Sequence, residues 1–289
     1  MYSIEELARD IGVSKRYLTR LSTNSDKCYY TYYLRKKGGS KRIIDAPNKE
    51  LKSIQSWILR NILDNIKIHV RSHGFVKRKS IKTNAKSHLG KKYILCLDIK
   101  DFFPSIPYES VLKVFSKRYK STSVAKCLAA LCTYNGYLPQ GAVTSPALSN
   151  IVFKIVDSQI TKLCNDSGIR YTRYADDLTF SCNDMTRLKN LINPMKSILE
   201  KYNFNLNKKK TRYYSEKGRM LVTGLLLNTG NLTIGRGKKR ILRSMIYNYF
   251  VKKDKDININ KIIGHLSFLR DIEPYTYEKF LRYCNSLKK

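Results

Sequence analysis

The first part of the chain carries two short runs of apolar residues at helical spacing. Within residues 3–22, each run places its apolar side chains on one face, and Gly12 separates the two runs. Ser14 can cap the second helix. Two short helices joined by a tight turn are the pattern of a helix-turn-helix, although helical hairpins that bind nothing share it. We therefore expect a small helical segment over residues 1–30.

The pattern then becomes strand-like and helical again. The segment YYTYYLRKKGGSKRIIDAP is rich in aromatic and β-branched residues, and Gly38-Gly39 marks a hairpin turn. Residues 48–66 carry apolar side chains at helical spacing. The run YILCLDI at 93–99 is apolar up to its Asp, and its length and flanks predict a buried strand.

Helical and strand patterns alternate in the second half of the chain. Helical spacing covers three stretches, roughly 108–134, 146–165 and 186–202. The segments NFNLNKKKTRYY and RMLVTGLLLN look like strands that pair with each other, and three basic helical segments follow them. This order predicts the α+β class, with an antiparallel sheet backed by helices.

The charge balance is strongly basic. The 289 residues include 56 Lys and Arg against 22 Asp and Glu, a formal net charge of +34, and 42% of them are hydrophobic. The hydrophobic share supplies a core and argues against disorder over most of the length. Basic residues run through the whole chain among 21 Tyr and 10 Phe. Such an excess matches a polyanion with many phosphates, which indicates a nucleic acid partner.

Signals for a membrane, a disulfide framework or zinc are weak. Apolar runs stay shorter than roughly 18 residues, so no membrane span is expected, and the first residues lack the regions of a signal peptide. The seven Cys form no CxxC pair, which indicates reduced thiols. His69 and His73 are spaced i, i+4 without a further ligand cluster, so we expect no zinc site there. We therefore expect a cytoplasmic protein.

The stretch YTRYADDLTFS at 171–181 raises a chemical question. Its flanks have strand composition, yet Asp176 and Asp177 place two carboxylates side by side at its centre. One explanation is a hairpin turn, because Asp is a good turn residue. The other is a cation site, in which a divalent metal neutralises carboxylates that are held close together.

Asp98 favours the cation site. It ends the predicted buried strand, and if that strand lies beside the Asp-Asp hairpin, three carboxylates come together. Three such anions fit two Mg²⁺ ions, with Mn²⁺ as a substitute, of which one activates a 3′-hydroxyl and the other holds a triphosphate. This arrangement predicts nucleotidyl transfer, which agrees with the basic charge.

Further motifs, in the same order along the chain, resemble those of a known family. Three ordered motifs of this chain resemble the palm of reverse transcriptases: LDIKDFF, LPQGAVTSP and YADD. Three further motifs resemble the first, sixth and seventh conserved blocks of that family: SKRIIDAP, NKKKT and LVTG. The resemblance covers roughly residues 35–230. NAKSH at 84–88 and VTG at 222–224 resemble two elements typical of bacterial retron reverse transcriptases.

The resemblance implies roles for the acidic and basic residues of the site. Asp98 and Asp176 would be the principal metal ligands, Asp177 would have a weaker or shared role, and the carbonyl of Ile99 would complete one metal shell. Lys210 matches a lysine that protonates the pyrophosphate leaving group. Because Lys208 and Lys209 adjoin it, this assignment could shift to either of them.

The resemblance also implies a nucleotide site. Phe103 would be the steric gate against a 2′-hydroxyl, whereas Phe102 points to the other face and is expected in the core. Plain packing is the alternative for Phe103. The incoming dNTP would further contact residues of two segments: Lys41, Arg42, Gln140 and Gly141. For the first two, a solvated charge is the alternative.

Two further groups are expected at the RNA and the primer. Val222, Thr223 and Gly224 would form the primer grip. Asn84 and His88 would be neighbours on one helix face, where the resemblance implies recognition of the cognate RNA or help with initiation. A structural capping role explains them equally well.

The expected protein is a right-hand polymerase in four parts. They are an N-terminal segment (1–30), fingers (31–90 and 115–150), a palm (91–114 and 151–232) and a thumb (233–289). The resemblance to retron enzymes implies that it would copy a cognate non-coding RNA (msr-msd) into DNA (msDNA) from the 2′-hydroxyl of a guanosine, and would act with a nearby-encoded effector protein in anti-phage defence. Another bacterial reverse transcriptase, of the group II intron or abortive-infection type, and a helix-turn-helix regulator are the alternatives.

Overall fold

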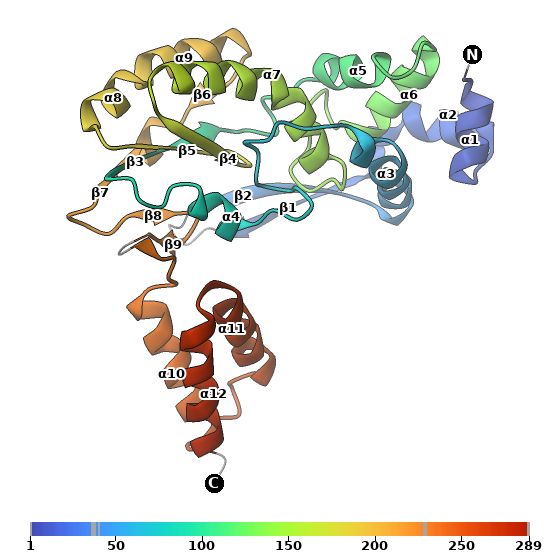
Figure 1. Ribbon diagram of the computed structural model, residues 1–289. Coiled ribbons are helices and arrows are strands. Elements are labelled where there is room, and N and C mark those ends of the chain that lie inside the picture. Colours follow the sequence, from blue (N-terminus) through green and yellow to red (C-terminus); the bar gives the residue numbers. More distant parts are fainter. Residues whose placement is uncertain (1, 36–38, 40, 228–229, 288–289) are drawn as a thin grey trace.

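The computed structural model describes residues 2–35, 39, 41–227 and 230–287 (Figure 1). Its first helices are α1 Ile4–Ile11, α2 Lys15–Thr23, α3 Lys49–Asn61, α4 Ile81–Lys86, α5 Tyr108–Ser116, α6 Thr122–Cys132 and α7 Ser145–Asp166. The later ones are α8 Met185–Asn190, α9 Ile192–Lys201, α10 Arg236–Phe250, α11 Ile259–Ile272 and α12 Pro274–Ser286. The strands are β1 Tyr29–Arg35, β2 Lys41–Pro47, β3 Tyr93–Lys100, β4 Arg170–Tyr174, β5 Asp177–Cys182, β6 Asn205–Leu206, β7 Arg212–Ser215, β8 Leu221–Val222 and β9 Leu225–Leu226. The α+β class is thereby confirmed.

A five-stranded antiparallel sheet is the centre of the molecule. Its order is β4-β5-β3-β6, and β7 also pairs with β3. Side chains alternate across a strand, so β3 serves two cores. Leu95, Leu97 and Ile99 belong to the core on the side of helices α7 to α9, whereas Ile94 belongs to the core beneath the sheet. Figure 1 shows the same two layers, with α7 to α9 above the sheet and α4, β8 and β9 below it.

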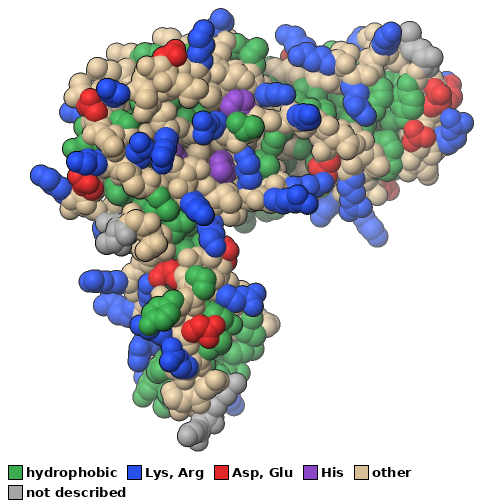
Figure 2. Space-filling view, viewed as in Figure 1, with side chains coloured by type: hydrophobic (Ala, Val, Ile, Leu, Met, Phe, Trp, Pro, Cys, Tyr) green, Lys and Arg blue, Asp and Glu red, His purple; other side chains and the backbone are tan. Residues whose placement is uncertain are grey.

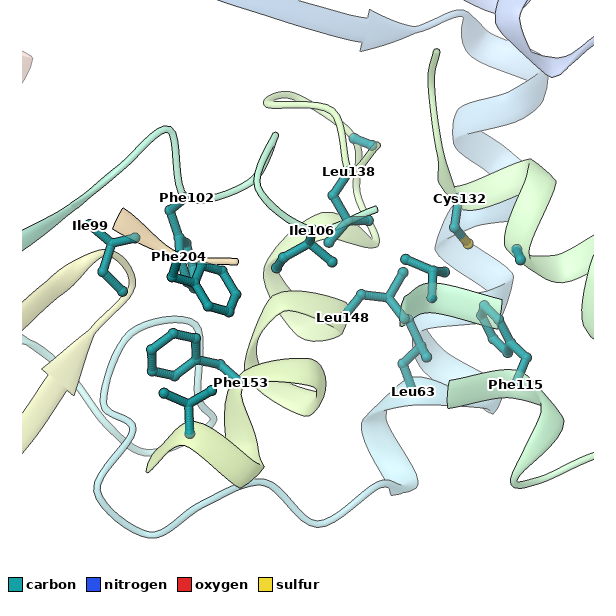
Figure 3. Close-up of a cluster of buried hydrophobic side chains, with 14 of the residues drawn as sticks. Leu63, Ile99, Phe102, Ile106, Phe115, Cys132, Leu138, Leu148, Phe153 and Phe204 are labelled. Carbon is teal, nitrogen blue, oxygen red and sulfur yellow. The ribbon is translucent and has the colours of Figure 1, made fainter. Parts of the chain in front are cut away.

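Aromatic rings fill the core between the sheet and α7. The ring centroid of Phe153 on α7 lies 5.6 Å from that of Phe102 and 4.9 Å from that of Phe204. Phe153 meets both rings edge to face, and Figure 3 shows the three rings packed beside Ile99, which follows Asp98 directly. Close packing on the helical side of the sheet therefore fixes the end of β3. Phe102 lies in this core, as predicted.

The N-terminal helices are part of this same core. Ser14 caps α2 by accepting a hydrogen bond from the backbone N–H of Tyr17, as predicted. Leu7 and Leu18 are fully buried, and both helices pack against α6. The apolar faces of the two helices are thus buried within this chain itself, while Lys15 and Arg16 face solvent.

The last three helices form a separate bundle. Their apolar residues join β8, β9 and Ala85 of α4 in a second core cluster, which includes Ile246 and Leu269. In Figure 1 this bundle projects away from the sheet and is joined to it through β8 and β9. The lower face of the sheet carries Asp98, in a cleft that Asp177, Lys210 and Gly224 also line.

Three details differ from the sequence patterns. The helix predicted over 186–202 is broken at Leu191, because Pro194 lacks the N–H that a continuous helix would need and is tolerated only in the first turn of α9. β6 and β7 pair with β3, not with the later segment. That segment folds on itself as β8 and β9, since Thr223 and Gly224 at φ 44° and 82° turn the chain between them.

Candidate active site

Two strands and one turn bring the predicted carboxylates together. Asp98 and Asp177 are direct cross-strand partners of β3 and β5. Ala175 and Asp176 form the two-residue turn between β4 and β5, and only Ala175 of the two has positive φ, at 56°, which is the pattern of a type II′ turn. The backbone N–H of Ile99 donates to the carbonyl oxygen of Asp176 at 3.0 Å. The expected juxtaposition is therefore present.

The three carboxylates repel one another. Burial, and after it the charge of Asp98, raises the pKa of Asp176. Loss of hydration in the cleft, and then the charges of Asp176 and Asp98, raise the pKa of Asp177 to about 6, although its side chain reaches solvent. Lys210 relieves part of this repulsion, because its Nζ lies 2.6 Å from Oδ2 of Asp98. The site thus attracts cations.

This donor set fits Mg²⁺ in its usual form. Within the described ranges, no three His, Cys, Asp or Glu side chains form a complete metal-binding cluster. Mg²⁺ does not need one, because it normally keeps several waters and takes one or two carboxylates together with substrate phosphates. The 5% exposed Asp98 and the half-buried Asp176 supply hard oxygen ligands of that kind. The structure favours a two-carboxylate site over a three-carboxylate cluster.

Lys210 is the lysine of NKKKT that contacts the carboxylates. Burial would lower its pKa, but the hydrogen bond to Asp98 and the charges of all three carboxylates raise it. Residues Lys208–Lys210 form a single 3₁₀ turn that follows β6, and this turn aims Lys210 at the end of β3. Its ammonium group is therefore available as a proton donor beside the carboxylates.

The hairpin of β1 and β2 separates the two predicted triphosphate ligands. Strands β1 and β2 pair in register, and successive residues of a strand face opposite sides. Arg42 is close enough to the carboxyl group of Asp176 to lower its pKa. Lys41 lies on the other face, with its Nζ 5.5 Å from the ring centroid of Tyr33. Only Arg42 of the pair faces the carboxylates, and the predicted turn residue Gly38 lies outside the described residues.

Gln140 and Gly141 hold this hairpin against the palm. The carbonyl oxygen of Gln140 accepts a hydrogen bond of 3.0 Å from the N–H of Asp45. Gly141 has φ 145°, and a Cβ there would lie 2.6 Å from the carbonyl oxygen of Asp45. Only glycine permits this approach. The structure thus gives both residues a contact with the fingers strand β2.

Phe103 lies at the edge of the core, against which it packs. Its side chain is partly exposed, and its ring centroid is 5.5 Å from that of the buried Phe102. On the other side it meets Phe75, at 6.3 Å. Phe75 is 53% exposed and has φ 57°, an uncommon backbone conformation for a bulky residue. The three rings form a short aromatic wall, and Gly74, the neighbour of Phe75, packs against the turn that carries Asp176.

The NAKSH motif lies inside the protein. Helix α4 ends at Lys86, so Asn84 and His88 do not share a helix face as expected. His88 is fully buried, with Nδ1 2.7 Å from Oγ of Ser181 and Nε2 2.7 Å from Oγ1 of Thr172. Both ring nitrogens are engaged by the sheet, which leaves none for RNA in this conformation. The placement favours the structural alternative for His88.

Asn84 joins this motif to the predicted primer grip. Its Nδ2 donates to Oγ1 of Thr223 at 3.4 Å, and that hydroxyl donates to the carbonyl oxygen of Ile81. The Oδ1 of Asn84 is buried and has no hydrogen-bond partner in the part of the chain that the structure describes. Val222 is fully buried in the second core, whereas Gly224 faces solvent. The two motifs thus form one structural unit.

Sequence reasoning missed the support of the hairpin. Arg173 and Asp157 are both fully buried and form an ion pair of 2.7 Å beneath the turn. Gly74 packs against the turn so closely that a Cβ would lie 2.5 Å from the backbone nitrogen of Ala175. One signal was visible: Tyr171 and Arg173 share one face of a strand that packs on a helix, and an arginine on such a face requires a buried partner.

Comparison with known proteins agrees with this site. Residues 34–227 match the family described as reverse transcriptase (RNA-dependent DNA polymerase). The chain is 34% identical to the retron Ec86 reverse transcriptase of Escherichia coli over 291 residues, which covers 100% of this chain and 90% of that protein. It is 31% identical to the retron Mx65 reverse transcriptase of Myxococcus xanthus over 294 residues, covering 96% and 69%.

The fold class is that of right-hand polymerases. Telomerase from Candida albicans has a similar structure, with a TM-score of 0.52 at 13% identity, over 90% of this chain and 59% of that one. The fold and the matched family define an RNA-directed DNA polymerase. Within that class, the chain belongs to the retron reverse transcriptases.

No helix among the described residues is long and apolar enough to cross a membrane.

A first prediction tests the structural role of His88. Burial lowers the pKa of its imidazole to about 3 from 6.5. Between pH 6.5 and 3 the unfolded chain therefore binds a proton that the folded chain does not, so stability falls as the pH falls through this window. We expect His88→Asn to cost about 1–3 kcal/mol at pH 7.5, because a buried hydroxyl loses its partner. The same change should flatten the loss of stability in acid.

Urea unfolding at pH 7.5, 6 and 5 measures both effects. His73, whose pKa burial lowers to about 4, leaves part of the pH dependence in place. The exposed His265 provides the matched control, and His265→Asn should change neither the stability at pH 7.5 nor its pH dependence. Parallel pH curves for His88→Asn and the parent protein would show that the imidazole is not held neutral.

Proposed function

We propose that this protein copies its cognate retron RNA into DNA by metal-assisted nucleotidyl transfer. The observation that carries the proposal is the meeting of Asp98, Asp176 and Asp177 with Lys210 on the open face of the sheet. The basic surface supports an RNA template. Figure 2 shows Lys and Arg side chains spread over the visible face, from the N-terminal helices to the last bundle, with few acidic groups among them.

Asp98 and Asp176 would hold the divalent ions. Asp177 would add its negative charge to the site, and the carbonyl of Ile99 would lie close by. When bound, two Mg²⁺ ions, or Mn²⁺ in their place, would activate a terminal hydroxyl and neutralise the triphosphate. Lys210 would give its proton to the departing pyrophosphate, for which its place beside Asp98 is suited.

The nucleotide would enter between the fingers hairpin and the aromatic wall. Arg42 would grip the triphosphate with its forked guanidinium group. Phe103 would lie beneath the sugar and reject a 2′-hydroxyl. Gln140 and Gly141 would set the height of the fingers above the nascent base pair, because they fix strand β2 by its backbone. Lys41, on the outer face, would contact template phosphates rather than the dNTP.

The four-part division remains part of this proposal. Residues 31–90 and 115–150 would act as fingers, 91–114 and 151–232 as the palm, and 233–289 as the thumb. The helices of the last segment are basic and project beside the open face of the sheet (Figure 1), where a clamp on the template–primer duplex would stand. Residues 1–30 would then serve the fold of the fingers, since they pack on α6.

The retron-specific steps follow the relatives. Synthesis would start from a 2′-hydroxyl of a guanosine in the cognate msr-msd RNA and yield branched msDNA. With a nearby-encoded effector protein, the complex would act in anti-phage defence. Similarity to the retron enzymes supports these steps. The residues of the site neither support nor oppose them.

A second prediction addresses the carboxylates. We expect Asp176→Ala with Asp177→Ala to abolish DNA synthesis on a primed RNA template in Mg²⁺, because both turn carboxylates are lost. RNA affinity should be unchanged or slightly higher, since Lys and Arg contacts to phosphate supply it. Primer extension and filter binding measure the two quantities. Asp166→Ala removes an exposed carboxylate at the end of α7 and should leave both unchanged. Full synthesis by the double variant would contradict the proposed function.

A third prediction concerns sugar choice. We expect Phe103→Ala to reduce the preference for dATP over ATP by at least about tenfold, because removing the ring opens space for the 2′-hydroxyl. Phe103→Tyr keeps a ring at the same place and should keep the preference. Single-nucleotide incorporation decides this, and unchanged discrimination in Phe103→Ala would assign the ring to packing alone.

A fourth prediction concerns initiation. We expect Asn84→Ala to lower branched-DNA synthesis on the cognate RNA by about tenfold, since its loss frees Thr223 at the primer grip. Extension of an annealed DNA primer on generic RNA should fall much less. Lys86→Ala, on the exposed side of the same helix, is the control. Equal losses in both reactions, or early melting, would place Asn84 in the scaffold.

A further inference from the structure

The hairpin that carries Asp176 stands on a fully buried arginine. Arg173 uses its whole guanidinium group: Nε and Nη2 donate to the two carboxylate oxygens of Asp157, at 2.9 and 2.7 Å. Nη1 donates to Oδ1 of Asn150 at 3.0 Å and to the carbonyl oxygen of Ala175 at 3.1 Å. Asp157 also accepts a hydrogen bond of 2.7 Å from the hydroxyl of Tyr171.

The surroundings keep this group charged and immobile. The guanidinium carbon lies 4.7 Å from the ring centroid of Phe153, so the cation rests on an aromatic face. Burial alone would lower the pKa of Arg173, but the Asp157 carboxylate outweighs it and the net shift is upward. The pair is thus an ionised, fully hydrogen-bonded unit within the core of α7 and β4.

Stability alone does not explain such a unit. Replacing a buried ion pair by apolar residues of similar volume is often neutral or stabilising, so a core at this position has no need of charge. What an apolar residue cannot do is donate to the carbonyl of Ala175. That carbonyl belongs to the peptide that joins Ala175 to Asp176, and Ala175 has a positive φ of 56° that a non-glycine residue rarely adopts.

Three contacts hold three successive peptides of the turn, and that of Arg173 holds the middle one. Nη1 of Arg173 binds its carbonyl oxygen, Gly74 packs against the nitrogen of Ala175, and the N–H of Ile99 binds the next carbonyl, that of Asp176. Asn150 links two of these supports, because it accepts from Arg173 and donates to the carbonyl of Gly74 at 2.9 Å. The turn has little freedom to change its type.

We propose that Arg173 is a positioning residue for the metal ligand Asp176. Held by Asp157 and Asn150, it fixes the peptide before Asp176 and thereby sets the direction of that carboxylate toward Asp98. This inference rests on the proposed metal-binding role of Asp176. Supporting residues behind metal ligands affect affinity in this way because they orient the ligands before the ion arrives.

The test uses two variants that remove the bond to Ala175 in different ways. Arg173→Met with Asp157→Leu replaces the pair by apolar side chains, which removes the charge without leaving a single buried ion. Arg173→Lys keeps the charge beside Asp157 but lacks the fork that reaches both Asp157 and Ala175. Arg170→Lys, on the exposed start of the same strand, is the matched control.

Three quantities are measured on the full chain bound to a primed RNA template. They are Mn²⁺ affinity from the electron paramagnetic resonance signal of the free ion, hydrogen exchange of the 174–182 peptide, and the Mg²⁺ concentration for half-maximal extension. We expect Mn²⁺ affinity to fall about 10–100-fold in both variants, with faster exchange in the turn and a matching rise in the Mg²⁺ requirement. Added Mg²⁺ should restore much of the rate, and Arg170→Lys should match the parent.

The outcomes separate this inference from the proposed function. Folded variants with parental Mn²⁺ affinity and parental exchange in the turn would overturn the positioning role. If the apolar pair fails to fold, the same comparison with Arg173→Lys decides. Asp176→Asn is run alongside: if it too leaves Mn²⁺ affinity unchanged, the metal role of Asp176 is wrong, and faster exchange in the Arg173 variants would still show that the guanidinium holds the turn.

Discussion

The buried ion pair of Arg173 and Asp157 is the constraint on which the catalytic face depends. Asp157 lies on α7, in the middle of the longest helix, and Arg173 lies on β4, one residue before the turn that carries Asp176 begins. A forked pair has one geometry, so helix and hairpin cannot slide or rotate relative to each other without breaking charged hydrogen bonds inside the core. The direction of the Asp176 side chain is thereby tied to the position of a helix on the opposite side of the sheet.

The sheet carries this constraint to the cleft because its two faces contact different surroundings. The alternation along β3 gives Leu95, Leu97 and Ile99 to the core under α7 to α9, and leaves Cys96 and Asp98 on the face toward the cleft. Packing on one side therefore fixes carboxylates on the other. The cleft side is less closely packed. It can hold carboxylates that repel one another because Lys210 and solvent lie beside them.

The motif that distinguishes retron enzymes in the sequence lies mostly inside the fold. His88 joins α4 to the central sheet through two hydroxyl groups, and Asn84 joins it to Thr223 in the turn between β8 and β9. That turn continues into the second core, where the last helical bundle begins. A change in the position of α4 would therefore displace both the central sheet and the turn between β8 and β9, so this short helix couples the two core clusters.

The sequence by itself determined the class of the fold, the strand that carries Asp98, the hairpin with Asp176 and Asp177, and the N-terminal helices with Ser14 as the cap of the second, because each depends on local spacing and composition. The break at Pro194 was also local but was overlooked. Only the tertiary structure decided that Lys41 and Arg42 face opposite sides, that His88 is buried, that β6 and β7 join β3, and that Arg173 meets Asp157. These features depend on strand register and on which faces meet across long sequence separations. A pattern of hydrophobic and polar residues does not specify which distant residue a side chain will contact.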